Sequence, residues 1–227
     1  MARLSSFRSA LVTGGRSGIG AATVAALERD GVEVQVLDIV DGFDVSDARA
    51  WDAVGAVDLA CLNAGVTTRM GDVEGGDVAT LTDEQYRRIL GVNVDGVVYG
   101  VRRLAHVMDG GAIVVTASLA GLTTIEIDPV YGGTKHFVVG FVRSVAKQLR
   151  ERGITINAVC PAIVDTPLLG ERGAERVRAA GYELLTPDNV ATAILKAARS
   201  GETGRAWPVI PGRPVEPHEF HRFFEST

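Results

Sequence analysis

The sequence predicts one doubly wound α/β domain over residues 1–227, with about seven parallel strands and helices on both faces of the sheet. Short apolar runs alternate with longer amphipathic runs along the whole chain. The short runs are almost continuously hydrophobic, as parallel strands covered on both faces must be. The length of 227 residues, with 46% hydrophobic residues, suits one large core better than two.

The strands and helices can be placed from these runs in chain order. Strands are expected at residues 10–15, 32–38, 57–65, 111–118, 153–162 and 206–211. Helices are expected at residues 18–30, 82–108, 131–150 and 187–198. Thr82 with Gln85 forms a capping-box pattern, and Thr186 before Pro187 is a second helix start.

Composition excludes several classes of protein. The net charge is −5 and the basic residues are scattered, so no nucleic-acid surface is expected. Cys61 and Cys160 lie in apolar runs outside any paired-cysteine or metal-ligand spacing, which predicts buried, reduced thiols and no metal site. The chain has no run of about 18 apolar residues and no signal-peptide pattern, so a cytoplasmic protein without a membrane partner is expected.

A glycine-rich turn follows the first strand, at residues 13–20 (TGGRSGIG). Glycines here allow a tight turn and a close approach of backbone N–H groups to a pyrophosphate, and the following helix start favours negative charge. Asp38 ends the second strand, where its carboxylate can accept the ribose hydroxyls of NAD and repel the 2′-phosphate of NADP. Arg16 could moderate that repulsion or could be a solvated side chain. NAD is therefore the expected cofactor, with NADP the lesser alternative.

Further motifs follow in a fixed order. The turn has the spacing GxxxGxG behind a threonine; residues 63–65 read NAG and residues 93–96 read NVDG. Ser118 stands thirteen residues before Tyr131, and Lys135 follows four residues after it. In these motifs the chain resembles the short-chain dehydrogenase/reductase family over nearly its whole length. The resemblance implies a Rossmann-type fold and hydride transfer between a nicotinamide cofactor and an alcohol or ketone.

Tyr131 and Lys135 form the centre of the expected catalytic set. Four residues on a helix place both side chains on one face. A phenol with a pKa of about 10 is a poor base, so we expect the lysine and the positive nicotinamide ring to lower that pKa. By resemblance, Tyr131 exchanges the proton of the alcohol, Ser118 hydrogen-bonds the substrate oxygen, Lys135 also holds the nicotinamide ribose, and Asn93 holds a water that links Lys135 to solvent.

Other cofactor contacts are implied by resemblance alone. Asp44 and Val45, at the end of a very short third strand, correspond to the acid-plus-apolar pair at the adenine. The family's Pro-Gly after the sixth strand is Pro161-Ala162 here. The cofactor-binding residues are then Gly14, Arg16, Ser17, Gly18, Ile19, Asp38, Asp44, Val45, Asn63, Ala64, Gly65, Tyr131, Lys135, Pro161, Ile163, Val164 and Thr166.

The substrate is expected to be a small alcohol or ketone bound under a short lid at residues 163–186. The lid carries three arginines that could attract an anion or simply be solvated, and the residues after Ser118 offer mostly apolar contact. Glu126 and Asp128 argue against a simple anion pocket. The lid arginines are Arg172, Arg176 and Arg178, and the expected contacts after Ser118 are Thr123, Thr124, Ile125 and Ile127.

Assembly and two alternative functions stay open. The resemblance implies a homodimer or homotetramer formed through the helices at residues 82–108 and 131–150. Phe220, Phe223 and Phe224 near the C-terminus are expected to pack on the core or on another subunit. The alternatives are a non-catalytic dinucleotide-binding redox sensor or scaffold, and an NADPH-dependent ketoreductase of a biosynthetic pathway.

Overall fold

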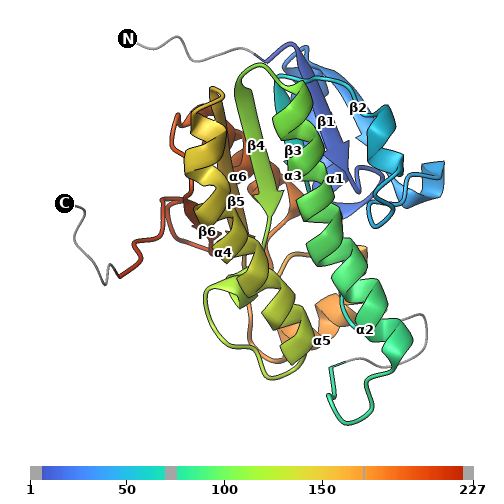
Figure 1. Cartoon of the computed structure of the whole chain (residues 1–227). Coiled ribbons are helices and arrows are strands. Elements are labelled where there is room, and N and C mark those ends of the chain that lie inside the picture. The colour runs from blue at the N-terminus through green and yellow to red at the C-terminus, as the bar shows by residue number, and fades with distance from the viewer. Residues whose placement is uncertain (1–6, 70–75, 171, 222–227) are drawn as a thin grey trace.

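The computed structural model describes residues 7–69, 76–170 and 172–221, and these form one six-stranded parallel sheet with helices on both faces (Figure 1). The strand order is β2-β1-β3-β4-β5-β6, so the chain changes direction across the sheet between β1 and β3. The strands are β1 (Ser9–Thr13), β2 (Glu33–Leu37), β3 (Leu59–Leu62), β4 (Gly111–Thr116), β5 (Ile154–Pro161) and β6 (Ala206–Val209). The helices are α1 (Gly18–Arg29), α2 (Asp83–Leu90), α3 (Gly96–Val107), α4 (Pro129–Arg150), α5 (Gly173–Ala179) and α6 (Pro187–Arg199).

Two hydrophobic cores cover the two faces of the sheet, which confirms the doubly wound α/β class. On one face Leu11, Ile113 and Ile156 pack with residues of α3 and α4. On the other face Val12 and Val114 pack with residues of α1 and α6. Figure 1 shows α3 and α4 in front of the sheet and α6 behind it. Alternate residues of each strand face opposite helical layers, and this explains why the strands read as continuous apolar runs.

One expected strand is absent from the described residues, and the expectation of about seven strands was wrong there. The segment after β2 instead forms two 3₁₀ turns at Ile39–Asp41 and Ala50–Ala53. Between them the Asp44 carboxylate accepts hydrogen bonds from the amide and hydroxyl of Ser46, at 2.8 and 2.7 Å. Such local side-chain bonds offer the backbone an alternative to a strand ladder.

The helix expected at residues 82–108 is interrupted at its centre. Thr82 and Gln85 form the predicted capping box at the start of α2. The segment Gly91–Asp95 then makes a π-helical turn before α3 begins. A single π turn inside a helix often lies at a functional site, and this one carries Asn93.

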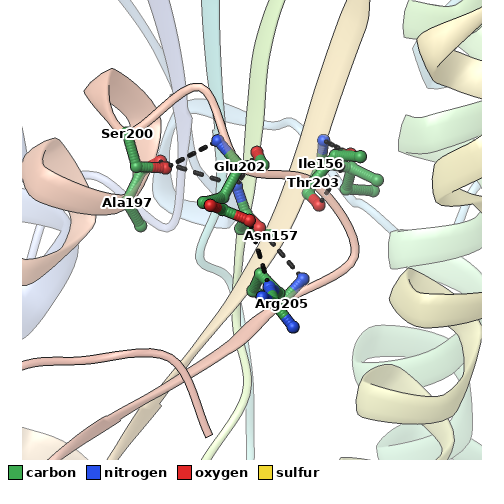
Figure 2. Close-up of polar contacts among 7 residues, drawn as sticks. All are labelled: Ile156, Asn157, Ala197, Ser200, Glu202, Thr203 and Arg205. Carbon is green, nitrogen blue, oxygen red and sulfur yellow. Dashed lines mark hydrogen bonds and ion pairs between the residues drawn. The ribbon is translucent and has the colours of Figure 1, made fainter. Parts of the chain in front are cut away.

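The edge strand β6 is attached to β5 through side chains (Figure 2). Asn157 of β5 is buried, donates to the Glu202 carbonyl at 2.8 Å and accepts from the Arg205 amide at 3.0 Å. Thr203 accepts from the Ile156 amide at 2.9 Å. These bonds give partners to backbone groups of the loop between α6 and β6 and to the Asn157 side chain. A polar residue can therefore lie inside a core strand.

Two more expectations can be compared with the structure. Cys61 and Cys160 are buried and free, as predicted. Phe220 packs against the core, with the Arg143 guanidinium 3.6 Å from its ring centroid, while Phe223 and Phe224 lie outside the described residues. In the described ranges, no helix is both long enough and apolar enough to cross a bilayer.

Candidate active site

The glycine-rich turn has the shape that close approach to a ligand requires. Gly18 has a φ of +48°, and a Cβ added to it would lie 3.0 Å from Cγ2 of Thr166. A Cβ added to Gly20 would collide with the Gly14 carbonyl and lie 2.7 Å from Nδ2 of Asn63. A side chain is thus excluded at Gly18 and at Gly20, and backbone N–H groups at this start of α1 can face a pyrophosphate.

The residues that follow β3 hold this turn in place. The Thr13 hydroxyl accepts from the amides of Asn63 and Ala64, at 2.9 and 3.0 Å. The Asn63 side chain donates to the Thr13 carbonyl at 3.2 Å and accepts from the Thr116 hydroxyl at 3.1 Å. Asn63 therefore connects the ends of three neighbouring strands, which is a structural task for its side chain.

Asp38 lies at the carboxyl end of β2, against the glycine-rich turn. Its carboxylate is buried and accepts from the Arg16 amide at 2.9 Å and from the Val40 amide at 3.2 Å. The Arg16 side chain turns to a different partner, since its Nε donates to Oδ2 of Asp41 at 2.7 Å. This ion pair raises the pKa of the Arg16 guanidinium, chiefly through the hydrogen bond to Asp41.

The segment after β5 meets the turn from the other side. Val164 pairs with Leu185 in an isolated parallel bridge, and its side chain is buried in the core. Thr166 lies beside Gly18, as the added-Cβ contact shows. The Val164 side chain is thus part of the core, whereas the Thr166 side chain lies beside the glycine-rich turn.

The remaining predicted cofactor residues occupy different surroundings. Asp44 is exposed, and Val45 is buried against the start of α3. Ser17 and Arg16 are exposed at the turn, Ile19 packs on the core of the α1 face, and Pro161 and Ile163 continue from the end of β5. The lid arginine Arg178 forms a 2.7 Å ion pair with Asp165.

Ser118, Tyr131 and Lys135 come together where β4 and α4 meet. The Ser118 hydroxyl lies close enough to the Tyr131 phenol to lower its pKa, and it accepts from the Ala120 amide at 3.1 Å. Nζ of Lys135 lies 5.5 Å from the centroid of the Tyr131 ring and donates to the Thr116 carbonyl at 3.0 Å. The helical spacing therefore does place the phenol and the ammonium on one face.

The pKa values differ from the expectation drawn from the sequence. Burial raises the pKa of the Tyr131 phenol, the hydrogen bond from Ser118 lowers it, and the charge of Asp128 raises it further. Burial also lowers the pKa of the Lys135 ammonium to about 8. The pKa of Tyr131 is raised in the protein because the cost of burying a phenolate exceeds the opposing effect of the hydrogen bond from Ser118.

Asn93 is buried behind the pair and makes three hydrogen bonds. It accepts from the Val66 amide at 2.9 Å and donates to the Val66 carbonyl at 2.8 Å. It also donates to the Thr134 hydroxyl at 3.0 Å, which itself donates to the Tyr131 carbonyl at 2.8 Å. A Cβ added to Gly65 would lie 3.4 Å from Nζ of Lys135 and 3.5 Å from Oδ1 of Asn93, so all three lie together.

Several residues of this site were missed in the sequence. Thr13, Thr116 and Thr134 carry the hydrogen bonds that hold the predicted residues, and Asp41 and Asp128 add charges beside them. Threonine and aspartate are frequent in turns and helix caps, so their type alone gave no signal. The only signal for Asp128 was its place shortly before an expected helix, where aspartate is a favoured N-cap residue.

A parallel sheet with a glycine-rich turn after β1 and a chain reversal between β1 and β3 defines a Rossmann-type protein. A family profile described as "short chain dehydrogenase" matches residues 44–177, more than half of the chain. The chain belongs to the short-chain dehydrogenase/reductase family, whose members are oxidoreductases that bind a nicotinamide dinucleotide.

Named relatives and solved structures agree with this assignment. A protein named as a ketoacyl reductase of the monensin polyketide synthase of Streptomyces virginiae is 36% identical over 215 residues, 79% of this chain and 78% of the relative. Cyclohexanol dehydrogenase of Acinetobacter sp. (strain SE19) is 34% identical over 193 residues, 71% of this chain and 75% of the relative. The structure of a 3-ketoacyl-(acyl-carrier-protein) reductase from Brucella melitensis complexed with NADH superimposes with a TM-score of 0.79 at 25% identity, covering 91% and 98% of the two chains.

Proposed function

We propose that this protein is an NAD(H)-dependent oxidoreductase that interconverts a secondary alcohol and its ketone. The observation that carries the proposal is the arrangement of Ser118, Tyr131 and Lys135, with a hydroxyl close to the phenol and a buried ammonium 5.5 Å from the centroid of its ring. No packing requirement explains a buried lysine and a serine at this phenol. Residues with these roles are what a hydride transfer coupled to a proton transfer needs.

In the proposed mechanism Tyr131 exchanges the proton and Ser118 orients the reacting oxygen. During oxidation the phenolate of Tyr131 takes the alcohol proton as the hydride leaves the same carbon, and during reduction the phenol returns it. The Ser118 hydroxyl donates to the oxygen on which negative charge develops. When bound, the nicotinamide accepts or supplies the hydride, and its oxidised, positive form favours the phenolate that the protein alone disfavours.

Cofactor preference is proposed to favour NAD because of two carboxylates near the ribose position. Asp38 faces the glycine-rich turn through its bond to the Arg16 amide. Asp41 holds the Arg16 side chain at 2.7 Å and so keeps it from a 2′-phosphate. A 2′-phosphate would meet two negative charges and an arginine that is already paired, which supports NAD over NADP.

The substrate is proposed to be a compact, mostly apolar alcohol or ketone. Ile127, in the segment before Tyr131, is 85% exposed, and Leu168 and Tyr182 on the lid segment are also exposed. Apolar side chains at such positions favour an apolar ligand. A homologous cyclohexanol dehydrogenase makes cyclohexanol a reasonable first probe. The homo-oligomeric state stays a prediction.

The test compares cofactor binding and turnover in the wild-type protein and in Tyr131→Phe. Fluorescence titration with NADH and NADPH should show tighter NADH binding, and NAD with cyclohexanol or related ring alcohols should give turnover. Tyr131→Phe should lose turnover by about three orders of magnitude with NADH affinity nearly unchanged. Wild-type turnover in that variant would refute the catalytic assignment, and binding without any turnover in the wild type would favour the redox-sensor alternative. Tighter NADPH binding would instead favour the biosynthetic ketoreductase.

A further inference from the structure

Asp128 is a buried carboxylate at the start of α4, outside the predicted catalytic and cofactor sets. It is 8% exposed and caps the helix that carries Tyr131. One carboxylate oxygen accepts from the Tyr131 amide at 3.0 Å. The other accepts from the amide and hydroxyl of Thr68, at 3.0 and 2.8 Å. Both carboxylate oxygens therefore accept hydrogen bonds, one from the backbone of Tyr131 and one from Thr68 in a separate segment.

That separate segment, residues 66–69, follows the turn beside Lys135. Asn93 holds Val66 through its amide and its carbonyl, at 2.9 and 2.8 Å. The Arg88 guanidinium donates to the Thr67 carbonyl at 3.3 Å. Together with Asp128 at Thr68, these side chains fix an irregular stretch that no strand or helix supports.

The backbone of Tyr131 is held on both sides by the same network. Asp128 accepts from its amide, and the Thr134 hydroxyl donates to its carbonyl at 2.8 Å. Thr134 in turn accepts from Asn93 at 3.0 Å. Asp128 and Asn93 are thus parallel connections between residues 66–69 and the first turns of α4.

We propose that Asp128 is a positioning residue for Tyr131, which fixes the tyrosine against residues 66–69 and places a negative charge beside it. This proposal rests on the acid/base role proposed for Tyr131. It assigns the carboxylate two separable effects, one geometric and one electrostatic. A neutral asparagine at this position would remove the second effect and keep only part of the first, because its amide has one acceptor oxygen in place of two.

The electrostatic effect has a definite direction among the groups around the phenol. Lys135 lies on the same helix, and Cys160 on β5 interacts with Lys135 from behind. Ser118, after β4, hydrogen-bonds the phenol and lowers its pKa, while the charge of Asp128 raises it. Removing the charge of Asp128 should therefore move phenolate formation to lower pH.

The first experiment is a spectrophotometric titration of Tyr131 in Asp128→Asn, and it does not require a substrate. Phenolate absorbance is recorded in the wild type and in Asp128→Asn, each corrected by the same protein with Tyr131→Phe. We expect the midpoint of Tyr131 in Asp128→Asn to fall by roughly half a pH unit or more. Asp188→Asn, which removes an exposed carboxylate from the first turn of α6, should leave the midpoint unchanged. A midpoint in Asp128→Asn equal to that of the wild type would overturn the electrostatic effect.

The second experiment tests the geometric effect with the charge kept. Thr68→Val removes the 2.8 Å bond to Asp128 and keeps a β-branched side chain. We expect kcat to fall by about threefold to tenfold, with KM for NADH and the Tyr131 midpoint unchanged. In Asp128→Ala, kcat should fall further, and Asp128→Asn should recover only part of it, because asparagine keeps one acceptor oxygen for the cap and its NH2 group cannot accept. Wild-type kcat in both Thr68→Val and Asp128→Ala would overturn the positioning role.

Failure of this proposal can be separated from failure of the proposed function. If the wild type lacks alcohol oxidation and ketone reduction, the acid/base role of Tyr131 fails, and the titration still reports on Asp128. If the wild type turns over but neither variant differs from it, the role of Asp128 alone is refuted.

Discussion

The two ends of the candidate site differ in the exposure of the charged groups around a buried carboxylate, Asp38 at the cofactor end and Asp128 at the tyrosine end. At the cofactor end, the Arg16 and Asp41 side chains are 55% and 40% exposed. At the tyrosine end, Lys135 and Asp128 are 4% and 8% exposed. Charges exposed to water are screened and contribute little to stability, whereas buried charges carry a large desolvation cost.

Charged residues of the same types should therefore affect different properties of the protein at the two ends of the site. Substitutions at the exposed end should change which cofactor binds, with little change in the free energy of unfolding. Substitutions at the buried end should change stability, its pH dependence and the proton transfer together. The following predictions test that division, from the largest expected effect to the smallest.

Gly20→Ala should have the largest effect, because it changes a backbone position on which both ends of the site depend. The added Cβ would collide with the Gly14 carbonyl and lie 2.7 Å from Nδ2 of Asn63. The Gly14 carbonyl belongs to the backbone and cannot move aside as a flexible side chain can. We therefore expect the free energy of unfolding to fall by about 3 kcal/mol. We also expect NADH binding to be lost. Urea unfolding and fluorescence titration measure both. Gly55→Ala is the control, since a Cβ there meets nothing within 4 Å; equal behaviour of the two variants would contradict the prediction.

Lys135→Met should raise stability at neutral pH while it removes turnover. Burial lowers the pKa of Lys135 from 10.5 to about 8, which corresponds to about 3 kcal/mol of lost stability when the group must be charged. The lost hydrogen bond to Thr116 offsets about 1 kcal/mol of the gain. Urea unfolding at pH 7 measures the difference between the two proteins.

The lowered pKa of Lys135 also predicts how the stability difference between the wild type and Lys135→Met depends on pH. Above pH 8 the folded protein releases the Lys135 proton, whereas the unfolded chain keeps it until about pH 10.5. The unfolded state then binds more protons, so the stability of the wild type should rise with pH across this window. The advantage of Lys135→Met should shrink accordingly, and a constant difference from pH 7 to pH 10 would argue against a buried ammonium.

Asp41→Asn should change cofactor selectivity without changing stability. Removing its charge frees Arg16 and takes one negative charge from the region of the 2′-phosphate. We expect NADPH affinity to rise by about fivefold to tenfold relative to NADH. Parallel titrations measure this ratio, and Asp52→Asn serves as a control at an exposed carboxylate nearby in sequence. Adding Arg16→Ala should cancel the gain; if it does not, the gain does not come from the arginine.

Arg16→Ala alone should have the smallest effect. The Arg16 side chain is exposed and paired with Asp41, so its removal should leave the melting temperature and NADH affinity close to those of the wild type. A scanning calorimetry trace and an NADH titration are sufficient. A marked loss of NADH binding would show that Arg16 itself contacts the cofactor. It would also contradict the expectation that the exposed ion pair affects only which cofactor is preferred.

Much of this architecture could be predicted because it depends on local patterns. The strand at residues 111–118 is a continuous apolar run, and β4 occupies Gly111–Thr116. The capping pattern at Thr82 and the helical spacing of Tyr131 and Lys135 are also local, and both are present. The expected strand at Asp44 was wrong because its carboxylate bonds Ser46 instead of allowing a ladder, a competition that residue types alone do not resolve.

The sequence by itself determined the alternation of strands and helices, the glycine-rich turn and the order of Asp38, Asn93, Ser118, Tyr131 and Lys135. These depend on hydrophobic periodicity and on spacing along one chain, which a sequence contains completely. Tertiary structure alone decided that Arg16 pairs with Asp41 and that Asp128 joins Thr68 to Tyr131. Residues sixty positions apart, such as Thr68 and Asp128, meet only after folding. Tertiary structure also decided the pKa values, because burial, which the sequence does not specify, outweighs the hydrogen bond from Ser118 at Tyr131 and the charge of Cys160 at Lys135.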